Sequence, residues 1–114
     1  MIRITLFKKG NDILGFLCSG HAGYAESGRD IVCAAVSALT TACANSLESV
    51  AHVRPNMRCG EGLLAVRLPE GCENRDAQIL FQGLLQGLRD IQAQYPSYIR
   101  LFEQTEAERR KHSC

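Results

Sequence analysis

The chain has 114 residues, of which 13 are Lys or Arg and 12 are Asp or Glu, so its formal net charge is +1. A chain of this length buries a single core, which argues against two domains. The near-neutral charge lacks the basic excess of a protein that tracks phosphate backbones, so we expect no direct nucleic-acid partner. No apolar run reaches the roughly 18 residues that cross a bilayer, and the N-terminus alternates instead of forming a signal peptide's apolar block. We therefore expect a cytoplasmic protein with no membrane partner.

Six cysteines are many for a short chain. In a secreted protein they would suggest disulfides, but the cytosol keeps thiols reduced, so catalysis, metal binding and simple burial are the open interpretations. The six are Cys18, Cys33, Cys43, Cys59, Cys72 and Cys114.

The first half of the chain predicts a hairpin, a glycine-rich loop and a long helix. Residues 2–6 alternate between apolar and polar, and a turn at residues 9–12 leads to a second apolar stretch at 13–18. Residues 19–29 contain three glycines and no hydrophobic period, which predicts a mobile loop. From Asp30 to about Val53 apolar residues recur at steps of three and four, which predicts a helix that stops before Pro55. The expected buried stripe is Val32, Val36, Leu39, Cys43, Leu47 and Val50.

The second half predicts another hairpin, a second helix and a last strand. The hairpin strands are expected at 56–59 and 63–68, the helix at 77–95 and the strand at 98–103. Gly83 and Gly87 lie one turn apart in this helix, where each costs roughly 1 kcal/mol against Ala. We expect another backbone to approach them closely.

The order ββαββαβ predicts a two-layer α+β domain, with two helices packed on one face of a mainly antiparallel sheet. We assign residues 1–103 to this single domain and residues 104–114 to a polar C-terminal tail. Because the strands carry apolar residues on both faces, we expect a second copy to cover the open face and form a homodimer.

Asp30 and Cys33 suggest an activated thiol. If Asp30 is the N-cap, Cys33 lies in the first helical turn, where the macrodipole and free amides favour a thiolate and could bind an oxyanion. His21 is the only histidine placed to reach it, since His52 lies near the far end of the helix and His112 lies in the tail. Cys33 and His21 are therefore the candidate nucleophile and base. Asp30 either caps the helix or orients the imidazole.

The loop before the helix has its own candidates. Gly23 and Gly28 permit backbone angles that larger residues resist, so the loop can fold back around an extended substrate. Tyr24 either lines that substrate channel or packs the loop. Ser37 lies one turn beyond Cys33 on the same helix face and supports either the thiolate or its own helix.

Residues 20–25 (GHAGYA), Gly28 and residues 30–39 (DIVCAAVSAL) resemble the signature of the ribosomal-processing cysteine protease family, also called YsxB-like. The resemblance covers almost the whole chain and weakens after about Phe102. It implies that Cys33 is the nucleophile and His21 the general base, with Gly20, Asp30 and Ser37 in supporting positions. It also implies a cytoplasmic homodimer without metal or cofactor.

The family's activity implies the substrate. Its members remove a short N-terminal extension from the precursor of large-subunit ribosomal protein twenty-seven, cutting after an aromatic residue. The alternatives are a non-catalytic protein that grips a ribosomal-protein segment, and a thiol redox switch at Cys33. A zinc site formed by Cys18, His21 and Cys33 is a weaker alternative, because no CxxC pair completes it.

Overall fold

The computed structural model describes residues 1–20 and 27–107, with residues 27–30 described by their backbone alone. Five strands and two helices follow in the order ββαββαβ. They are β1 (Ile2–Lys9), β2 (Asp12–Ser19), α1 (Ser27–Ser49), β3 (Asn56–Gly60), β4 (Leu63–Arg67), α2 (Arg75–Gln94) and β5 (Ile99–Thr105).

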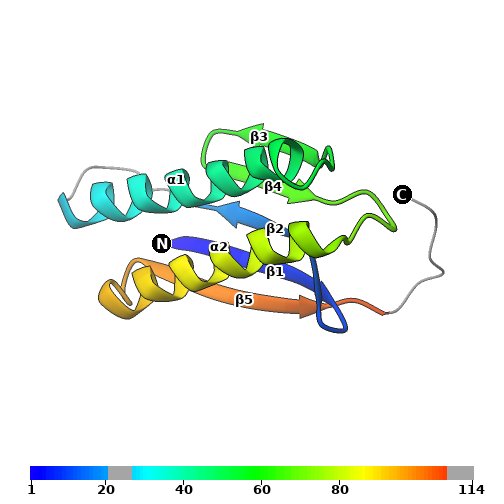
Figure 1. Ribbon diagram of the computed structural model, residues 1–114. Helices are drawn as coiled ribbons and strands as arrows, with labels where there is room; N and C mark the ends of the chain where they lie inside the picture. The colour runs from blue at the N-terminus through cyan, green and yellow to red at the C-terminus, as the bar shows by residue number, and fades with distance from the viewer. Residues whose placement is uncertain (21–26, 108–114) are drawn as a thin grey trace.

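The strands form one sheet in the order β3-β4-β2-β1-β5. All neighbouring pairs are antiparallel except β1 and β5, which are parallel. Both helices lie side by side on one face of this sheet, in front of it in Figure 1. The predicted two-layer α+β class is therefore confirmed. We call the helix-covered face of the sheet the inner face and the opposite one the outer face.

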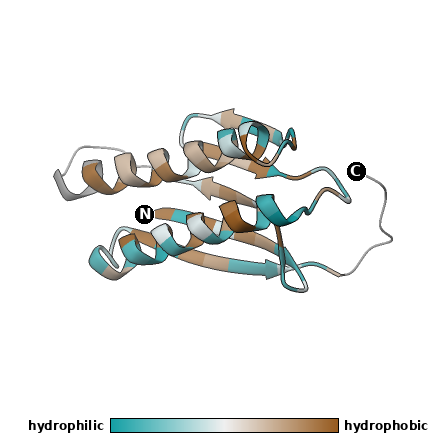
Figure 2. Cartoon of the chain, viewed as in Figure 1, coloured by the Kyte–Doolittle hydropathy of each residue, from teal (hydrophilic) through white to brown (hydrophobic). Residues whose placement is uncertain are grey.

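The core lies between the inner face and the helices. Ile4, Leu6 and Phe16 are fully buried on the sheet side, and Phe16 meets Phe81 of α2 edge to face, with ring centroids 6.5 Å apart. Hydrophobic colour runs along the strands and along α1 in Figure 2. Burial of these side chains supplies the main stabilisation of the fold.

α1 begins and ends earlier than the sequence predicts. It starts at Ser27, so the last residues of the expected loop are helical. It ends at Ser49, and Val50 beyond it is exposed instead of completing the buried stripe. His52 adopts a left-handed conformation with φ of 59°, and the amide of Val53 donates to the carbonyl of Leu47. This capping geometry ends the helix before Pro55 can act.

Side-chain hydrogen bonds fix α2 against its neighbours. Asn74 caps the helix, because its side chain accepts from the amide of Ala77 at 2.8 Å. Gln78 binds both backbone groups of Ile13, accepting from its amide at 2.7 Å and donating to its carbonyl at 2.8 Å. Ile13 lies beside an irregularity in the β1–β2 register, so Gln78 takes the place of a strand partner there.

The prediction for the two glycines of α2 is wrong. A Cβ at Gly87 would meet the Leu39 side chain of α1 at 2.8 Å, whereas a Cβ at Gly83 would meet nothing within 4 Å. Gly87 therefore makes room for a side chain of the neighbouring helix rather than for a backbone, and Gly83 faces open space.

The domain also extends further than predicted. β5 continues to Thr105, and the amide of Glu106 donates to the carbonyl of Lys8. Residues 104–106 thus belong to the fold rather than to a polar tail.

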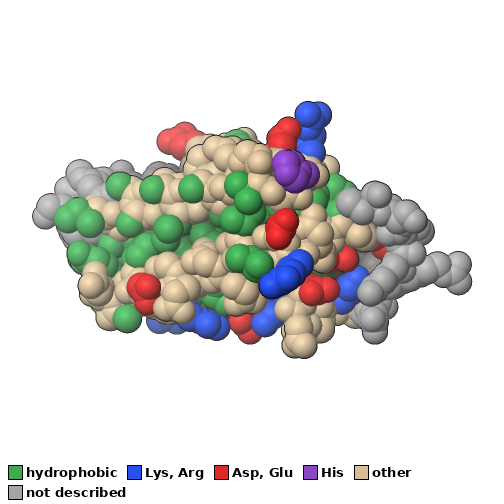
Figure 3. All heavy atoms as spheres, viewed as in Figure 1, with side chains coloured by type: hydrophobic (Ala, Val, Ile, Leu, Met, Phe, Trp, Pro, Cys, Tyr) green, Lys and Arg blue, Asp and Glu red, His purple; other side chains and the backbone are tan. Residues whose placement is uncertain are grey.

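α1 is also apolar over an unusual length. From Ile31 to Ser49 it is long and apolar enough to cross a membrane by length and composition alone, which corrects the expectation that no run reaches this length. The core helix of a soluble protein passes the same test. No charged residue occurs between Ile31 and Asn45. Figure 3 shows this helix side of the molecule, with hydrophobic side chains along α1.

Candidate active site

A pocket of about 250 Å³ lies where α1 passes the sheet, and Cys33 lines it. The sheet contributes the start of β1, the end of β2 and the turn that joins β3 to β4, while α1 contributes residues one and two turns beyond Cys33. The lining residues are Ile2, Cys18, Gly20, Cys33, Val36, Ser37, Thr40, Gly60, Gly62, Leu63 and Leu64.

Cys33 is not where the capping argument places it. α1 begins at Ser27, so Asp30 is inside the helix and is not its N-cap. Cys33 follows the helix start by six residues, beyond the first turn in which free amides and the macrodipole act most strongly. The predicted oxyanion binding by the first-turn amides therefore does not apply to Cys33. Its side chain is half-buried and packs against the hydrophobic core.

Ser37 lines the same pocket one helical turn after Cys33, as the spacing predicts. Thr40, a further turn along, is buried, and its hydroxyl donates to the carbonyl of Val36 at 2.8 Å. This bond satisfies the buried hydroxyl within its own helix. Ser37 is thus the exposed polar residue that α1 contributes to the pocket lining.

Gly20 shows why the sequence needs glycine at the end of β2. Its φ is +91°, and a Cβ there would meet the carbonyl oxygen of Met1. Its amide donates to the carbonyl of Gly62 at 3.0 Å. Only glycine fits this conformation and this space, so Gly20 fixes the direction in which the chain leaves the sheet toward residue 21.

Cys18 is a second thiol in the pocket. Burial raises its pKa, and the neighbouring Cys33 sulfur raises it further by charge repulsion. Cys18 is therefore held as a neutral thiol, and a thiolate is disfavoured there.

The structure does not describe the side chains of four predicted site residues. His21, Gly23 and Tyr24 lie outside the described residues, and the side chain of Asp30 is not described. The dyad, the substrate loop, its predicted mobility and the zinc set with His21 therefore stay predictions. Gly28 belongs to the first turn of α1, not to the loop.

Two further cysteines have defined environments. Cys43 is buried as predicted, and burial raises its pKa to about 12. Cys72, for which the sequence spacing indicates no role, is disulfide-bonded.

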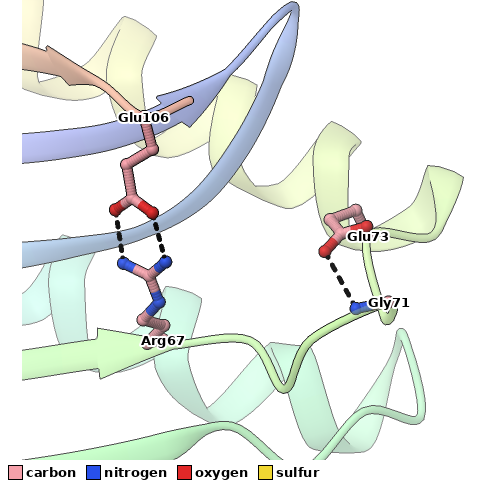
Figure 4. A network of polar contacts seen from close by, with 4 residues as sticks. All are labelled: Arg67, Gly71, Glu73 and Glu106. Carbon is pink, nitrogen blue, oxygen red and sulfur yellow. Dashed lines mark hydrogen bonds and ion pairs between the residues drawn. The ribbon is translucent and has the colours of Figure 1, made fainter. Parts of the chain in front are cut away.

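A second cavity, of about 190 Å³, lies at the other end of the sheet. Arg67 forms two hydrogen bonds there with Glu106, at 2.6 and 2.7 Å, and Glu73 accepts from the amide of Gly71 (Figure 4). The hydrogen bonds to the Glu106 carboxylate are the largest cause of the raised pKa of Arg67. Among the residues that the structure describes, the cavity lining includes no cysteine, serine or histidine, so the Cys33 pocket is the better candidate for catalysis.

Sequence reasoning missed the sheet side of the Cys33 pocket. Ile2, Gly62 and Leu63 come from segments far apart in the chain, and their meeting depends on the strand order. The Gly60-Glu61-Gly62 turn signal was visible, but nothing local places that turn beside Cys33.

A half-buried helix thiol with a serine one turn away, lining a pocket of side-chain size, defines a candidate thiol-dependent enzyme. Comparison with known proteins shows to which family of enzymes the chain belongs. The model of the family described as cysteine protease Prp matches residues 1–100, and the chain belongs to that family.

Individual relatives agree with this assignment. The chain is 32% identical over 108 residues to the ribosomal processing cysteine protease Prp of Bacillus subtilis, covering 89% of this chain and 96% of the relative. The crystal structure of SMU.848 from Streptococcus mutans is similar with a TM-score of 0.86 and 29% identity, over 93% of this chain and 96% of that one. The essential ribosomal processing protease Prp of S. aureus, in complex with a covalently linked product peptide, gives a TM-score of 0.81 at 28% identity, over 91% of this chain and all of that one.

Proposed function

We propose that this chain is the cytoplasmic endopeptidase that removes the short N-terminal extension from the precursor of large-subunit ribosomal protein twenty-seven. The observation that carries the proposal is a half-buried Cys33 in a pocket, in a chain of the cysteine protease Prp family. The covalently linked product peptide named for the S. aureus protease supports a covalent mechanism.

In the proposed mechanism His21 takes the proton of the Cys33 thiol, and the thiolate attacks the scissile carbonyl carbon. The C–N bond breaks, His21 gives its proton to the leaving amine, and a thioester to Cys33 forms. Water, deprotonated by His21, then attacks the thioester, and the peptide acid and the free thiol are released. The raised pKa of Cys18 favours Cys33 as the nucleophile of the two pocket thiols.

The test is cleavage of a synthetic peptide that spans the precursor's processing site. We expect Cys33→Ala and His21→Ala each to lose at least about 1,000-fold in kcat/KM, because the nucleophile and its base act as one unit. Cys59→Ala is the matched control, since Cys59 is an exposed thiol on β3 that does not line the pocket. Cleavage by Cys33→Ala at the wild-type rate would contradict the mechanism.

Two further results separate the alternatives. Mass spectrometry of a rapidly quenched reaction should show the acyl fragment on wild-type enzyme and none on Cys33→Ala. Tight peptide binding without turnover by wild-type protein would instead favour a non-catalytic binding protein.

We also propose a homodimer, formed through the exposed side of α1 rather than the open sheet face. The exposed side between Ile31 and Asn45 carries no charge, so two copies can pack there without burying one. Light scattering should give a mass near twice 12.5 kDa. Ala42→Glu on this side of α1 should halve it, whereas Ala93→Glu, at an exposed position near the end of α2, should not.

A further inference from the structure

The outer face of the sheet is basic although the chain is nearly neutral. The pairing register places three rows of side chains on this face, one from each strand in the order β5-β1-β2-β4-β3. The rows are Arg100, Arg3, Ser19, Leu63 and Gly60; then Phe102, Thr5, Leu17, Ala65 and Arg58; then Gln104, Phe7, Gly15, Arg67 and Asn56. Four of these residues are arginines and none is acidic.

Three of the arginines are available to a ligand. Arg67 is bound by Glu106 and lies over the Phe7 ring, with its guanidinium carbon 5.8 Å from the ring centroid. Arg3, Arg58 and Arg100 are exposed and form no ion pair with the residues that the structure describes. They lie toward the two edges of the sheet, on β1, β3 and β5.

Between these arginines the face is apolar. Phe102 on β5 is 43% exposed, and Leu17 on β2 is half-buried in the same row. A sheet surface with an exposed aromatic ring and nearby arginines suits a single-stranded nucleic acid, because bases stack on the ring and phosphates bind the guanidinium groups.

The charges also exclude a second copy as occupant. A copy facing this surface would bring three more exposed arginines, and the Glu106 carboxylate at this face is already bound to Arg67, so like charges would meet. An RNA strand supplies the negative charge that this surface lacks.

We propose that the outer face of the sheet binds single-stranded RNA. The face is continuous with the Cys33 pocket, because Leu63 lies in the same row as Arg3, with Ser19 of β2 between them, and also lines the pocket. RNA bound there lies next to the pocket mouth, which is the position needed to act on a protein substrate carried by an RNA particle. RNA binding itself does not depend on the proposed peptidase activity.

The test is fluorescence anisotropy with a labelled single-stranded 12-nucleotide RNA of mixed sequence, using the full chain in low salt. The variant combines Arg3→Gln, Arg58→Gln and Arg100→Gln. The matched control combines Arg54→Gln, Arg75→Gln and Arg89→Gln, which changes the net charge equally but alters residues outside the three rows. Thermal unfolding shows whether each triple variant is folded.

We expect the outer-face triple variant to bind about 100-fold more weakly and to lower the slope of log K against log salt by about 2, since each phosphate contact on a single strand contributes about 0.7. The control should lose less than about threefold. Phe102→Ala should weaken binding about tenfold without changing the slope, because it removes a stacking contact and no charge.

Four results would overturn the proposal. The first is no RNA binding by folded wild-type protein at 50 mM salt, and the second is an equal loss in the two triple variants. The third is binding to anionic phosphatidylserine vesicles without binding to RNA. A change of oligomeric mass in the outer-face variant alone would likewise overturn it, since the face would then be an interface between copies.

Discussion

The two faces of the sheet are built from the same strands but have opposite chemistry. On the inner face Ile4, Leu6 and Phe16 are fully buried under the helices. On the outer face the alternate positions of the same strands include Arg3 and Leu17 and lie open. A net charge of +1 is therefore an average over unlike surfaces. The expectation of no nucleic-acid partner was drawn from this average, whereas the proposal of RNA binding follows from the position of each charge.

The largest expected effect is on the free energy of unfolding when Phe16 is truncated, compared with its neighbour Leu17 on the opposite face of the sheet. Phe16→Ala should lower the free energy of unfolding by about 4 kcal/mol, because it leaves a cavity against Phe81. Leu17→Ala should cost about 1 kcal/mol, because Leu17 is only half-buried on the outer face. Urea denaturation measures both, and equal losses would contradict the distinction between the faces.

The next effect concerns Gly15, an outer-face position with no space for a side chain. A Cβ at Gly15 would meet the carbonyl oxygen of Val66 in β4, so Gly15→Ala must push β2 and β4 apart. We expect a loss of about 2 kcal/mol. Gly83→Ala is the control, because nothing lies within 4 Å of a Cβ there, and in a helix the change should stabilise by up to about 1 kcal/mol. A stable Gly15→Ala protein would show that the strands can separate freely.

The burial of the Cys43 thiol between the helices and the inner face should affect how stability depends on pH. Burial raises the pKa of Cys43 to about 12 from its ordinary 9.0, so the folded protein keeps this proton where the unfolded chain releases it. This contribution is complete below pH 9 and is lost as the pH rises toward 12. Wild-type stability should therefore fall more than that of Cys43→Ala, by roughly 1 kcal/mol extra at pH 10. Parallel curves for the two proteins would indicate that water reaches the thiol.

The smallest effect is expected at the outer-face ion pair. Arg67→Met should cost about 1 kcal/mol or less, because the Arg67 side chain is 42% exposed and solvent screens its charge. The loss should shrink as salt is added, which denaturation at 50 mM and 1 M NaCl measures. A large, salt-independent loss would show instead that packing on Phe7 dominates.

Most of the fold could be predicted because its signals are local. The alternation of residues 2–6 and the three-and-four spacing from Val32 to Leu47 each depend on a few neighbouring residues. The ends of α1 could not be predicted, because His52 in a left-handed conformation ends the helix and no propensity marks histidine for that role. The roles of Gly83 and Gly87 depend on the neighbouring helix, which the local pattern does not describe.

The candidate site was predictable only on its helix side. Cys33 and Ser37 share a helix face by spacing alone, and the structure places both at one pocket. The opposite wall, with Ile2 and Leu63, depends on the order in which strands pair, which is a long-range property. The placement of Cys33 in the first helical turn was wrong, because Ser27 and not Asp30 begins the helix.

The parallel pairing of β1 with β5 has a consequence for synthesis of the protein. The first strand of the chain receives its second neighbour only from residues 99–105, and the amide of Ile2 donates to the carbonyl of Tyr98. Because Ile2 also lines the Cys33 pocket, that wall of the pocket cannot reach its final position until residues 99–105 have left the ribosome. The enzyme is thus expected to stay incomplete during its own translation and to gain a finished pocket only when its last strand closes the sheet.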